Sequence, residues 1–236
     1  MTFFILIANA DIGSGAEKAK TIKPFELQVS AGGSQKTGNT ESSEARLSLD
    51  GAYTKANFIT EFTGFYQYKE VDSYTDQNLM ELKVKELLNT NSHWLPFLTY
   101  EFSWDEIKGV EYDHNLGAGT KYIVFSEGGG KLSFSTAALY QVYKNKDFDE
   151  EENIAFALEP RYSWKRDQTQ FVAMASYQAD PGDTDNFKYS YNFKLTYFLN
   201  SVLGISAEFE SRYRNIVSAD SEKLDTTTLF SVTLAY

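Results

Sequence analysis

The stretch FKYSYNFKLTY, residues 187–197, decides the fold class of this chain because two kinds of side chain alternate along it. One set of alternate positions is aromatic or aliphatic: Phe187, Tyr189, Tyr191, Phe193, Leu195 and Tyr197. The positions between them are polar: Lys188, Ser190, Asn192, Lys194 and Thr196. Successive side chains of a strand point to opposite faces, whereas a helix would mix the two sets. The stretch therefore predicts a strand with one apolar face and one polar, partly charged face.

The same alternation recurs from Pro24 to the end of the chain, in segments separated by polar connections. Repetition of this pattern is typical of a transmembrane β-barrel, in which each strand faces lipid on one side and the lumen on the other. The predicted strands are 24–34, 43–54, 57–70, 76–89, 93–106, 109–125, 130–144, 152–166, 169–179, 186–199, 203–216 and 225–236. We therefore expect an all-β, antiparallel up-and-down barrel of about twelve strands over residues 24–236.

The connections between these strands predict the orientation of the barrel. Alternate links are short, such as Asn200-Ser201, and the links between them are mostly longer and more acidic, such as residues 144–152. Bacterial barrels have short turns on the periplasmic side and longer loops outside, and an even strand number brings both ends of the chain to one side. We therefore expect both termini in the periplasm. The Ile107-Lys108 link is short for an outside loop, and Pro160 lies mid-strand, where we expect a β-bulge.

The first residues resemble part of a secretory signal peptide. Residues 3–7 are apolar, and Ala8-Asn9-Ala10 matches the small-x-small cleavage pattern, although a basic region before the apolar run is missing. We interpret residues 1–10 as a signal-peptide remnant and residues 11–23 as an N-terminal periplasmic segment. The alternative is an ordinary chain terminus.

Composition excludes several classes of protein. The chain has no cysteine, which excludes disulfides and thiolate metal sites, and its net charge of -11 argues against a nucleic-acid partner. No apolar run approaches the ~18 residues of a spanning helix. A soluble β-sandwich or lipocalin-like barrel would also alternate, but aromatic residues would not gather at the strand ends. Here they do, as Tyr66, Trp94, Trp104 and Tyr197 show, which favours the aromatic girdles of a bacterial outer-membrane barrel.

The last strand carries a possible recognition signal. Phe230, Val232, Leu234 and Tyr236 share one face, and the chain ends on the aromatic residue. An exposed strand edge with a terminal aromatic group is a template for β-augmentation. We interpret these four residues as the assembly signal read by the barrel assembly machinery. The alternative is a last strand that happens to end in tyrosine.

Several short motifs, taken in their order along the chain, resemble those of a known family. The motifs are Ala31-Gly32-Gly33 followed by Thr37-Gly38-Asn39-Thr40, then residues 116–122, Glu159 to Trp164, and the final strand from Asp225. In this order they resemble the YdiY-like family of salt-induced outer-membrane proteins, a domain of unknown function, over nearly the whole mature chain. The resemblance implies an outer-membrane barrel and brings no ligand or reaction.

The sequence offers little catalytic chemistry. Its two histidines, His93 and His114, fall at opposite ends of the predicted barrel and should not share a metal ion. Neither has a serine two positions away on the same face, as membrane-embedded lipid hydrolases require. The acidic residues 147 and 149–152, and Asp180, Asp183 and Asp185, are interpreted as solvated loops rather than Ca²⁺ ligands. We expect no catalytic residue, cofactor or metal site.

The polar face of the strands is the most informative surface. Its charged residues carry both signs, so they could pair and fill the interior or line a narrow polar pore. The candidate lumen-lining residues are Arg46, Glu61, Lys83, Glu101, Lys121, Glu159, Arg161, Lys188, Lys194, Glu208, Glu210, Arg212 and Arg214.

Three hypotheses for function follow. The first is a structural or envelope-maintenance role without catalysis. The alternative is a narrow passive channel for ions or small polar solutes, and the second alternative is a lipid-modifying enzyme. In each case the expected partners are outer-membrane lipid, lipopolysaccharide and the assembly machinery.

Overall fold

A computed structural model describes residues 25–36, 42–72, 74–90, 92–217 and 222–236. The signal-peptide remnant, the segment 11–23 and the Thr37-Gly38-Asn39-Thr40 motif lie outside the described residues. The twelve strands are β1 (Phe25–Lys36), β2 (Ser42–Lys55), β3 (Phe58–Val71), β4 (Tyr74–Leu88), β5 (Trp94–Asp105), β6 (Val110–Glu127), β7 (Gly130–Asn145), β8 (Glu151–Arg166), β9 (Thr169–Ala179), β10 (Phe187–Phe198), β11 (Leu203–Arg214) and β12 (Leu224–Ala235).

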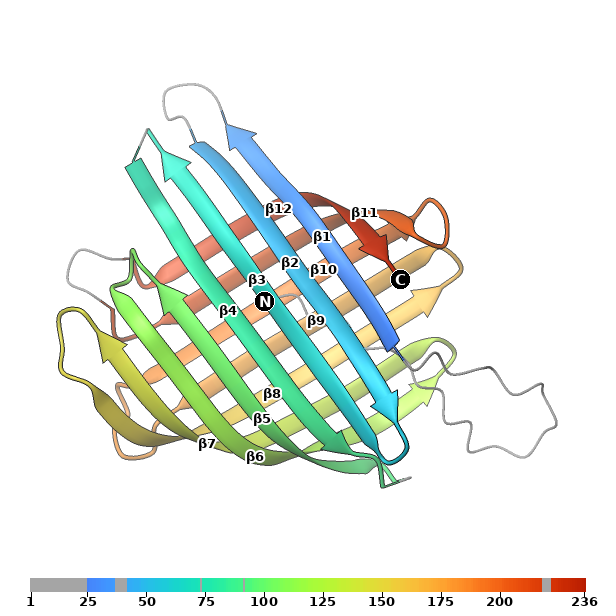
Figure 1. Cartoon of the computed structure of the whole chain (residues 1–236), viewed down its shortest axis with the longest axis horizontal. Coiled ribbons are helices and arrows are strands. Elements are labelled where there is room, and N and C mark those ends of the chain that lie inside the picture. The colour runs from blue at the N-terminus through green and yellow to red at the C-terminus, as the bar shows by residue number, and fades with distance from the viewer. Residues whose placement is uncertain (1–24, 37–41, 73, 91, 218–221) are drawn as a thin grey trace.

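Each strand pairs antiparallel with its sequence neighbour, and β1 pairs with β12, so the sheet closes into a barrel. The predicted twelve-stranded antiparallel barrel is therefore confirmed. In Figure 1 the strands run obliquely around the barrel, as closure of a sheet requires. We call the end with the short turns, where β1 begins and β12 ends, the turn end, and the opposite end the loop end. No helix in the described part of the chain is long and apolar enough to span a bilayer.

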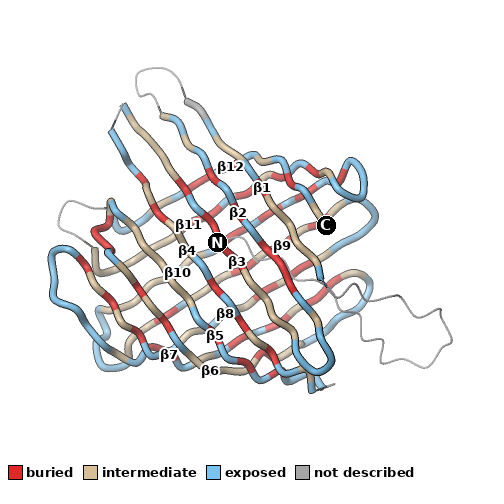
Figure 2. The backbone as a smooth tube through the Cα atoms, viewed as in Figure 1, coloured by how far each residue is buried: buried red, intermediate tan, exposed pale blue. Residues whose placement is uncertain are grey.

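The outer face of the barrel is apolar. Buried and exposed residues alternate along most strands (Figure 2), and the exposed positions carry large hydrophobic side chains such as Leu98, Leu116 and Phe156, which are 64%, 61% and 56% exposed. A soluble protein buries such residues, because a continuous exposed apolar surface is unfavourable in water. The barrel is therefore inside out relative to a soluble protein, as a membrane-spanning barrel must be.

Pro160 causes no β-bulge, so that expectation was wrong. Leu158 pairs with Tyr177 and Arg161 with Met174 in one unshifted register, while Glu159 and Pro160 have no partners in the described β8–β9 ladder. On the other side of β8 the ladder is continuous, and Pro160 pairs with Phe134 of β7. The missing N–H is accommodated by opening the β8–β9 ladder over two positions rather than by inserting a residue.

The short connection between β5 and β6 is a tight turn of residues 106–109. Its backbone is fixed by hydrogen bonds from the N–H of Gly109 to the carbonyl of Glu106 and from the N–H of Lys108 to the carboxylate of Asp105. Gly109 has a φ of 69°, a conformation that glycine adopts without a steric penalty. The turn leaves the Lys108 side chain directed into the barrel, where it becomes part of the interior.

Candidate functional site in the barrel interior

The charged residues on the polar face of the strands lie in the barrel interior. Arg46, Lys83, Lys121, Arg161, Lys194, Glu208 and Glu210 are buried. Glu61, Glu101, Glu159, Lys188, Arg212 and Arg214 are half-buried. Burying an isolated charge is costly, so side chains of this kind must find partners of opposite sign.

The first cluster of partners, near the loop end, surrounds Asp113 of β6. The Asp113 side chain is 0% exposed and accepts hydrogen bonds of 2.9 Å from Lys188 of β10 and from Arg214 of β11. The amides of Asn115 and Gln141 donate to its other oxygen, at 2.8 and 2.7 Å. Strands β7, β8 and β9 separate β6 from β10 around the wall, so these contacts cross the interior.

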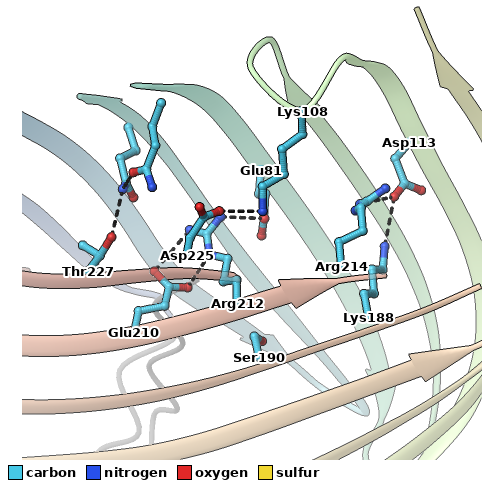
Figure 3. A network of polar contacts seen from close by, with 12 residues as sticks. Glu81, Lys108, Asp113, Lys188, Ser190, Glu210, Arg212, Arg214, Asp225 and Thr227 are labelled. Atoms are coloured by element: carbon cyan, nitrogen blue, oxygen red, sulfur yellow. Dashed lines mark hydrogen bonds and ion pairs between the residues drawn. The ribbon is translucent and has the colours of Figure 1, made fainter. Parts of the chain in front are cut away.

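The second cluster joins β11 to the opposite wall (Figure 3). Arg212 donates to Glu81 of β4 at 3.1 Å and to Glu210 of its own strand at 2.9 Å. Glu210 also pairs with Arg46 of β2. Strands β12, β1, β2 and β3 lie between β11 and β4, so the Arg212–Glu81 pair spans the lumen. Lys108, in the turn between β5 and β6, forms a second ion pair across the lumen, with its ammonium 2.6 Å from the carboxylate of Asp225 in β12.

A third cluster joins β4 to β8 and β5. Lys83 pairs with Glu159 and lies 2.5 Å from Glu101, and Lys85 lies 2.9 Å from Glu159. Glu159 thus receives two lysines from a strand that is separated from its own by β5, β6 and β7.

Two further pairs continue the network toward the turn end. Lys121 of β6 lies 2.8 Å from Glu61 of β3. Lys194 of β10 lies 3.9 Å from Glu208 and donates to the hydroxyl of Ser30 at 3.3 Å. Arg161 is buried on the inner face of β8, two residues after Glu159. Opposite charges from different walls therefore meet at several levels of the barrel.

The interior also contains an apolar cluster, which was not predicted. Leu87, Leu95 and Phe97 are buried on the inner faces of β4 and β5, with Ile59, Ile123 and Ala137 packed against them. The ammonium of Lys85 lies 4.4 Å from the centre of the Phe97 ring, within the range of a cation–π interaction. Hydrophobic packing therefore fills part of the interior near the turn end.

A cavity of about 140 Å³ remains among the charged clusters in the half of the barrel toward the loop end. Its lining includes both signs of charge: Lys83, Lys108, Lys188, Arg212 and Arg214 against Glu81, Glu101, Asp105, Glu159 and Asp225. Such a wall offers no net preference for an anion or a cation.

Four residues of this network were missed by sequence reasoning: Glu81, Lys108, Asp113 and Asp225. Glu81, Asp113 and Asp225 lie on the inner faces of their strands. Residues two positions apart share a face, so the predicted inward direction of Lys83 already implied that Glu81 points inward. Lys108 carried no such signal, because its inward direction depends on the turn and on the distant β12.

The histidines do not form a site together. His93 lies next to β5 at the turn end, where its Nδ1 is 2.7 Å from the carbonyl of Ile123. His114 lies on the outer face of β6, and its Nδ1 is 2.9 Å from the Tyr100 hydroxyl. Within the described ranges, no group of three or more His, Cys, Asp or Glu residues is placed to hold a metal ion.

The acidic loop residues contact neighbouring groups of the chain. Tyr112 and Tyr140 donate to Glu150 and Glu152, respectively. The Asp180 carboxylate accepts a hydrogen bond from the backbone N–H of Gly182. These contacts stabilise the loops locally.

Comparisons with known proteins agree with the fold. A family model described as "Protein of unknown function, DUF481" matches residues 29–236, which confirms the family resemblance. No curated protein sequence matches the chain. Among solved structures, the NanC porin is similar with a TM-score of 0.52 and 10% identity, over 89% of this chain and 97% of that chain.

An outer-membrane channel from Pseudomonas putida F1 is similar with a TM-score of 0.51 and 11% identity, over 95% of this chain and 99% of that chain. At such identities the likeness concerns the fold alone. Together with the closed sheet and the apolar outer face, it identifies a bacterial outer-membrane β-barrel. Since the family model covers most of the chain, the protein belongs to the DUF481 family of proteins of unknown function.

Proposed function

We propose that this protein is a structural barrel of the outer membrane whose interior is closed by ion pairs and which catalyses no reaction. The observation that carries the proposal is the set of pairs between opposite walls, above all Arg212 with Glu81 and Arg214 with Asp113. In each pair a long arginine side chain reaches across the path that a solute would follow along the barrel axis, to a carboxylate on another strand.

The pairs also explain why the interior would stay closed. When a buried ion pair separates, each charge stays buried without a partner of opposite sign. Removing one partner of such a pair typically lowers the stability of a protein by about 3–5 kcal/mol. Several such pairs lie at different levels, so opening a continuous path requires several to separate together. A rigid, closed barrel is suited to a role in maintaining the envelope.

The second candidate is a narrow passive channel for ions or small polar solutes. The cavity of about 140 Å³ favours it, because polar, partly accessible side chains already line part of the axis. The Lys188 and Glu81 side chains there are each 28% exposed, so they can exchange partners with water or a solute. Balanced charges of this kind would give weak selectivity between anions and cations.

Single-channel recording in planar bilayers separates the two candidates. Wild-type protein, shown to be folded by heat-modifiable gel migration, should give no conductance steps above background. The Glu81→Ala/Arg212→Ala variant removes one crossing pair and should give small steps. The control is Arg166→Ala, since Arg166 is 75% exposed and lies at a turn. Conductance steps from the wild type would reject the closed barrel in favour of the channel.

The absence of catalysis is supported by the surroundings of the two histidines. The Nδ1 of His93 is close to the carbonyl of Ile123 and that of His114 to the hydroxyl of Tyr100, so neither Nδ1 is paired with the serine hydroxyl that a membrane-embedded lipid hydrolase requires. We therefore expect no phospholipid hydrolysis by wild-type protein, and the same background for His114→Ala.

The proposed placement puts the turn end in the periplasm and the loop end outside. Tyrosines on the outer face would then lie at the level of lipopolysaccharide, which together with phospholipid is the proposed lipid partner. The outward residues Phe230, Val232, Leu234 and Tyr236 are 66%, 51%, 51% and 78% exposed. This exposure supports their proposed role as the signal that the assembly machinery binds.

A further inference from the structure

The cavity of about 140 Å³ reaches the loop end of the barrel. Lys108, in the turn between β5 and β6, and Asp225, the second residue of β12, both line it. Toward the turn end its lining includes Lys83 and Glu159, which form an ion pair with each other. A protein cavity of about 150 Å³ can hold one benzene molecule, so this cavity accepts a solute of about six to eight non-hydrogen atoms.

Two cations lie side by side on one wall of the cavity. Lys188 of β10 and Arg214 of β11 are directly opposite each other in the β10–β11 ladder, and both line the cavity. Like charges in this arrangement repel each other and need an anion near them. Each cation is 2.9 Å from the same oxygen of Asp113, Oδ2, and the Asp113 side chain is 0% exposed. In the described structure this pair of cations therefore shares one carboxylate and carries one positive charge in excess.

An excess negative charge lies elsewhere on the cavity wall. Asp105, the last residue of β5, lines the cavity and is half-buried. One of its carboxylate oxygens accepts a hydrogen bond of 3.0 Å from the backbone N–H of Lys108. The ammonium of Lys108 pairs instead with Asp225, 2.6 Å away. Among the described residues, no cation lies within ion-pair distance of Asp105.

The wall that carries Asp105 is acidic at two further positions. Glu81 of β4 and Glu101 of β5 line the cavity, and each uses one carboxylate oxygen in an ion pair, at 3.1 and 2.5 Å. Four strands, β6 to β9, separate β5 from β10, and four more separate β11 from β4, so this wall lies opposite the two cations. Figure 3 shows the group around Glu81 apart from the group around Asp113.

This distribution of charge is complementary to a solute that carries both signs. An anion would be attracted by the cations of β10 and β11 but repelled by the acidic wall, and a cation would meet the opposite problem. A zwitterion can place each end against the opposite charge, and its zero net charge lowers the cost of leaving water. Between the walls, the hydroxyls of Ser176 and Ser190, 2.8 Å apart, add polar groups to the lining.

We propose that the cavity binds a small zwitterion of the α-amino-acid type, with a carboxylate and a primary ammonium. Its carboxylate accepts hydrogen bonds from Lys188 and Arg214, whose ammonium and guanidinium groups have N–H donors beyond those directed at Asp113. Its ammonium pairs with Asp105. Binding requires neither a closed nor a conducting barrel, so this inference goes beyond the proposed function and is tested separately.

Calorimetric titration of the folded protein in non-ionic micelles tests the proposal with alanine and its two half-molecules. Propionate lacks the ammonium of alanine, and ethylammonium lacks its carboxylate. Alanine should bind, and each half-molecule should bind about tenfold more weakly, the effect expected for loss of one hydrogen bond between charged groups. Phenylalanine carries the same two charged groups on a molecule too large for the cavity and should not bind.

Two substitutions each remove one charge of the proposed site. Lys188→Gln leaves Asp113 with Arg214 and two amide donors, so the variant should fold. Asp105→Asn keeps an oxygen that can accept the hydrogen bond from Lys108, so the turn should be retained. Each substitution should weaken alanine binding about tenfold.

Two matched controls should bind alanine like the wild type. Lys144→Gln removes a lysine from the outer face of β7. Asp183→Asn changes an exposed loop carboxylate that, like that of Asp105, accepts a hydrogen bond of 3.0 Å from a backbone N–H. Heat-modifiable migration shows whether each variant is folded.

Four results would overturn the proposal. Wild-type protein that binds no alanine has no such site. Propionate or ethylammonium that binds as tightly as alanine would show a site for one sign of charge only. Phenylalanine that binds equally well would place recognition outside the cavity. Folded Lys188→Gln or Asp105→Asn with unchanged affinity would show that the named charge does not take part. Conductance steps from wild-type protein would reject the closed barrel and leave these results unaffected.

Discussion

Replacing Asp113 by asparagine tests the interior network at the residue where most of its contacts meet. The substitution keeps the shape of the side chain and removes its charge. Lys188 and Arg214, whose side chains are 28% and 19% exposed, then lose the carboxylate that lies 2.9 Å from each. The new amide group also places an N–H₂ where one oxygen accepted hydrogen bonds, so at least one donor contact becomes repulsive.

The expected loss of stability follows from the burial of this pair. Removing one partner of a buried ion pair costs about 3–5 kcal/mol, and the partial exposure of the two cations favours the lower end, about 3 kcal/mol. With a urea dependence of about 1–3 kcal/mol per molar, the midpoint of unfolding should fall by about 1 M or more. The measurement is urea unfolding in micelles, followed by tryptophan fluorescence and by heat-modifiable gel migration.

The control is Asp167→Asn, which removes the same charge from an exposed ion pair. The Asp167 and Arg166 side chains are 90% and 75% exposed and 3.9 Å apart, and asparagine tolerates the positive φ of 51° at this position. Its midpoint should not shift measurably, because exposed pairs contribute little. If Asp113→Asn were as stable as this control, the crossing pairs would not stabilise the barrel, and the argument for a closed interior would fail.

Two further predictions concern the seam between β1 and β12. Gly32→Val should lower the yield of heat-modifiable, folded protein on refolding, because its side chain would collide with the Phe230 carbonyl, whereas Gly182→Ala, in a loop with only the Asp180 carboxylate nearby, should refold normally. Tyr236→Ala keeps the backbone hydrogen bond from residue 236 to Leu27, so it should refold into liposomes like the wild type but accumulate less in the outer membrane of cells. Parallel losses in both assays would show that Tyr236 acts by stabilising the seam rather than as an assembly signal.

The sequence alone determined the strands and their two faces. Alternation in stretches such as Phe187–Tyr197 depends only on the twofold period of an extended chain, which is a local property. A connection as short as Asn200-Ser201 can join only adjacent antiparallel strands, so the order of the strands was predictable. The number of strands followed from the number of alternating segments. Each strand boundary could therefore be assigned to within a few residues, and Glu81 and Asp113 could have been placed inside by the same rule.

Only the tertiary structure decided which of those charges meet. Arg212 reaches Glu81, and Lys108 reaches Asp225, across a lumen whose width and stagger arise from closure of the whole sheet. The structure also showed that the β8–β9 ladder is interrupted at Pro160 without a shift of register, and that β1 and β12 pair only between Gln28–Gly33 and Phe230–Ala235. The cross-lumen pairs and the extent of the β1–β12 pairing depend on the register between distant strands, and no local pattern of residues specifies that register.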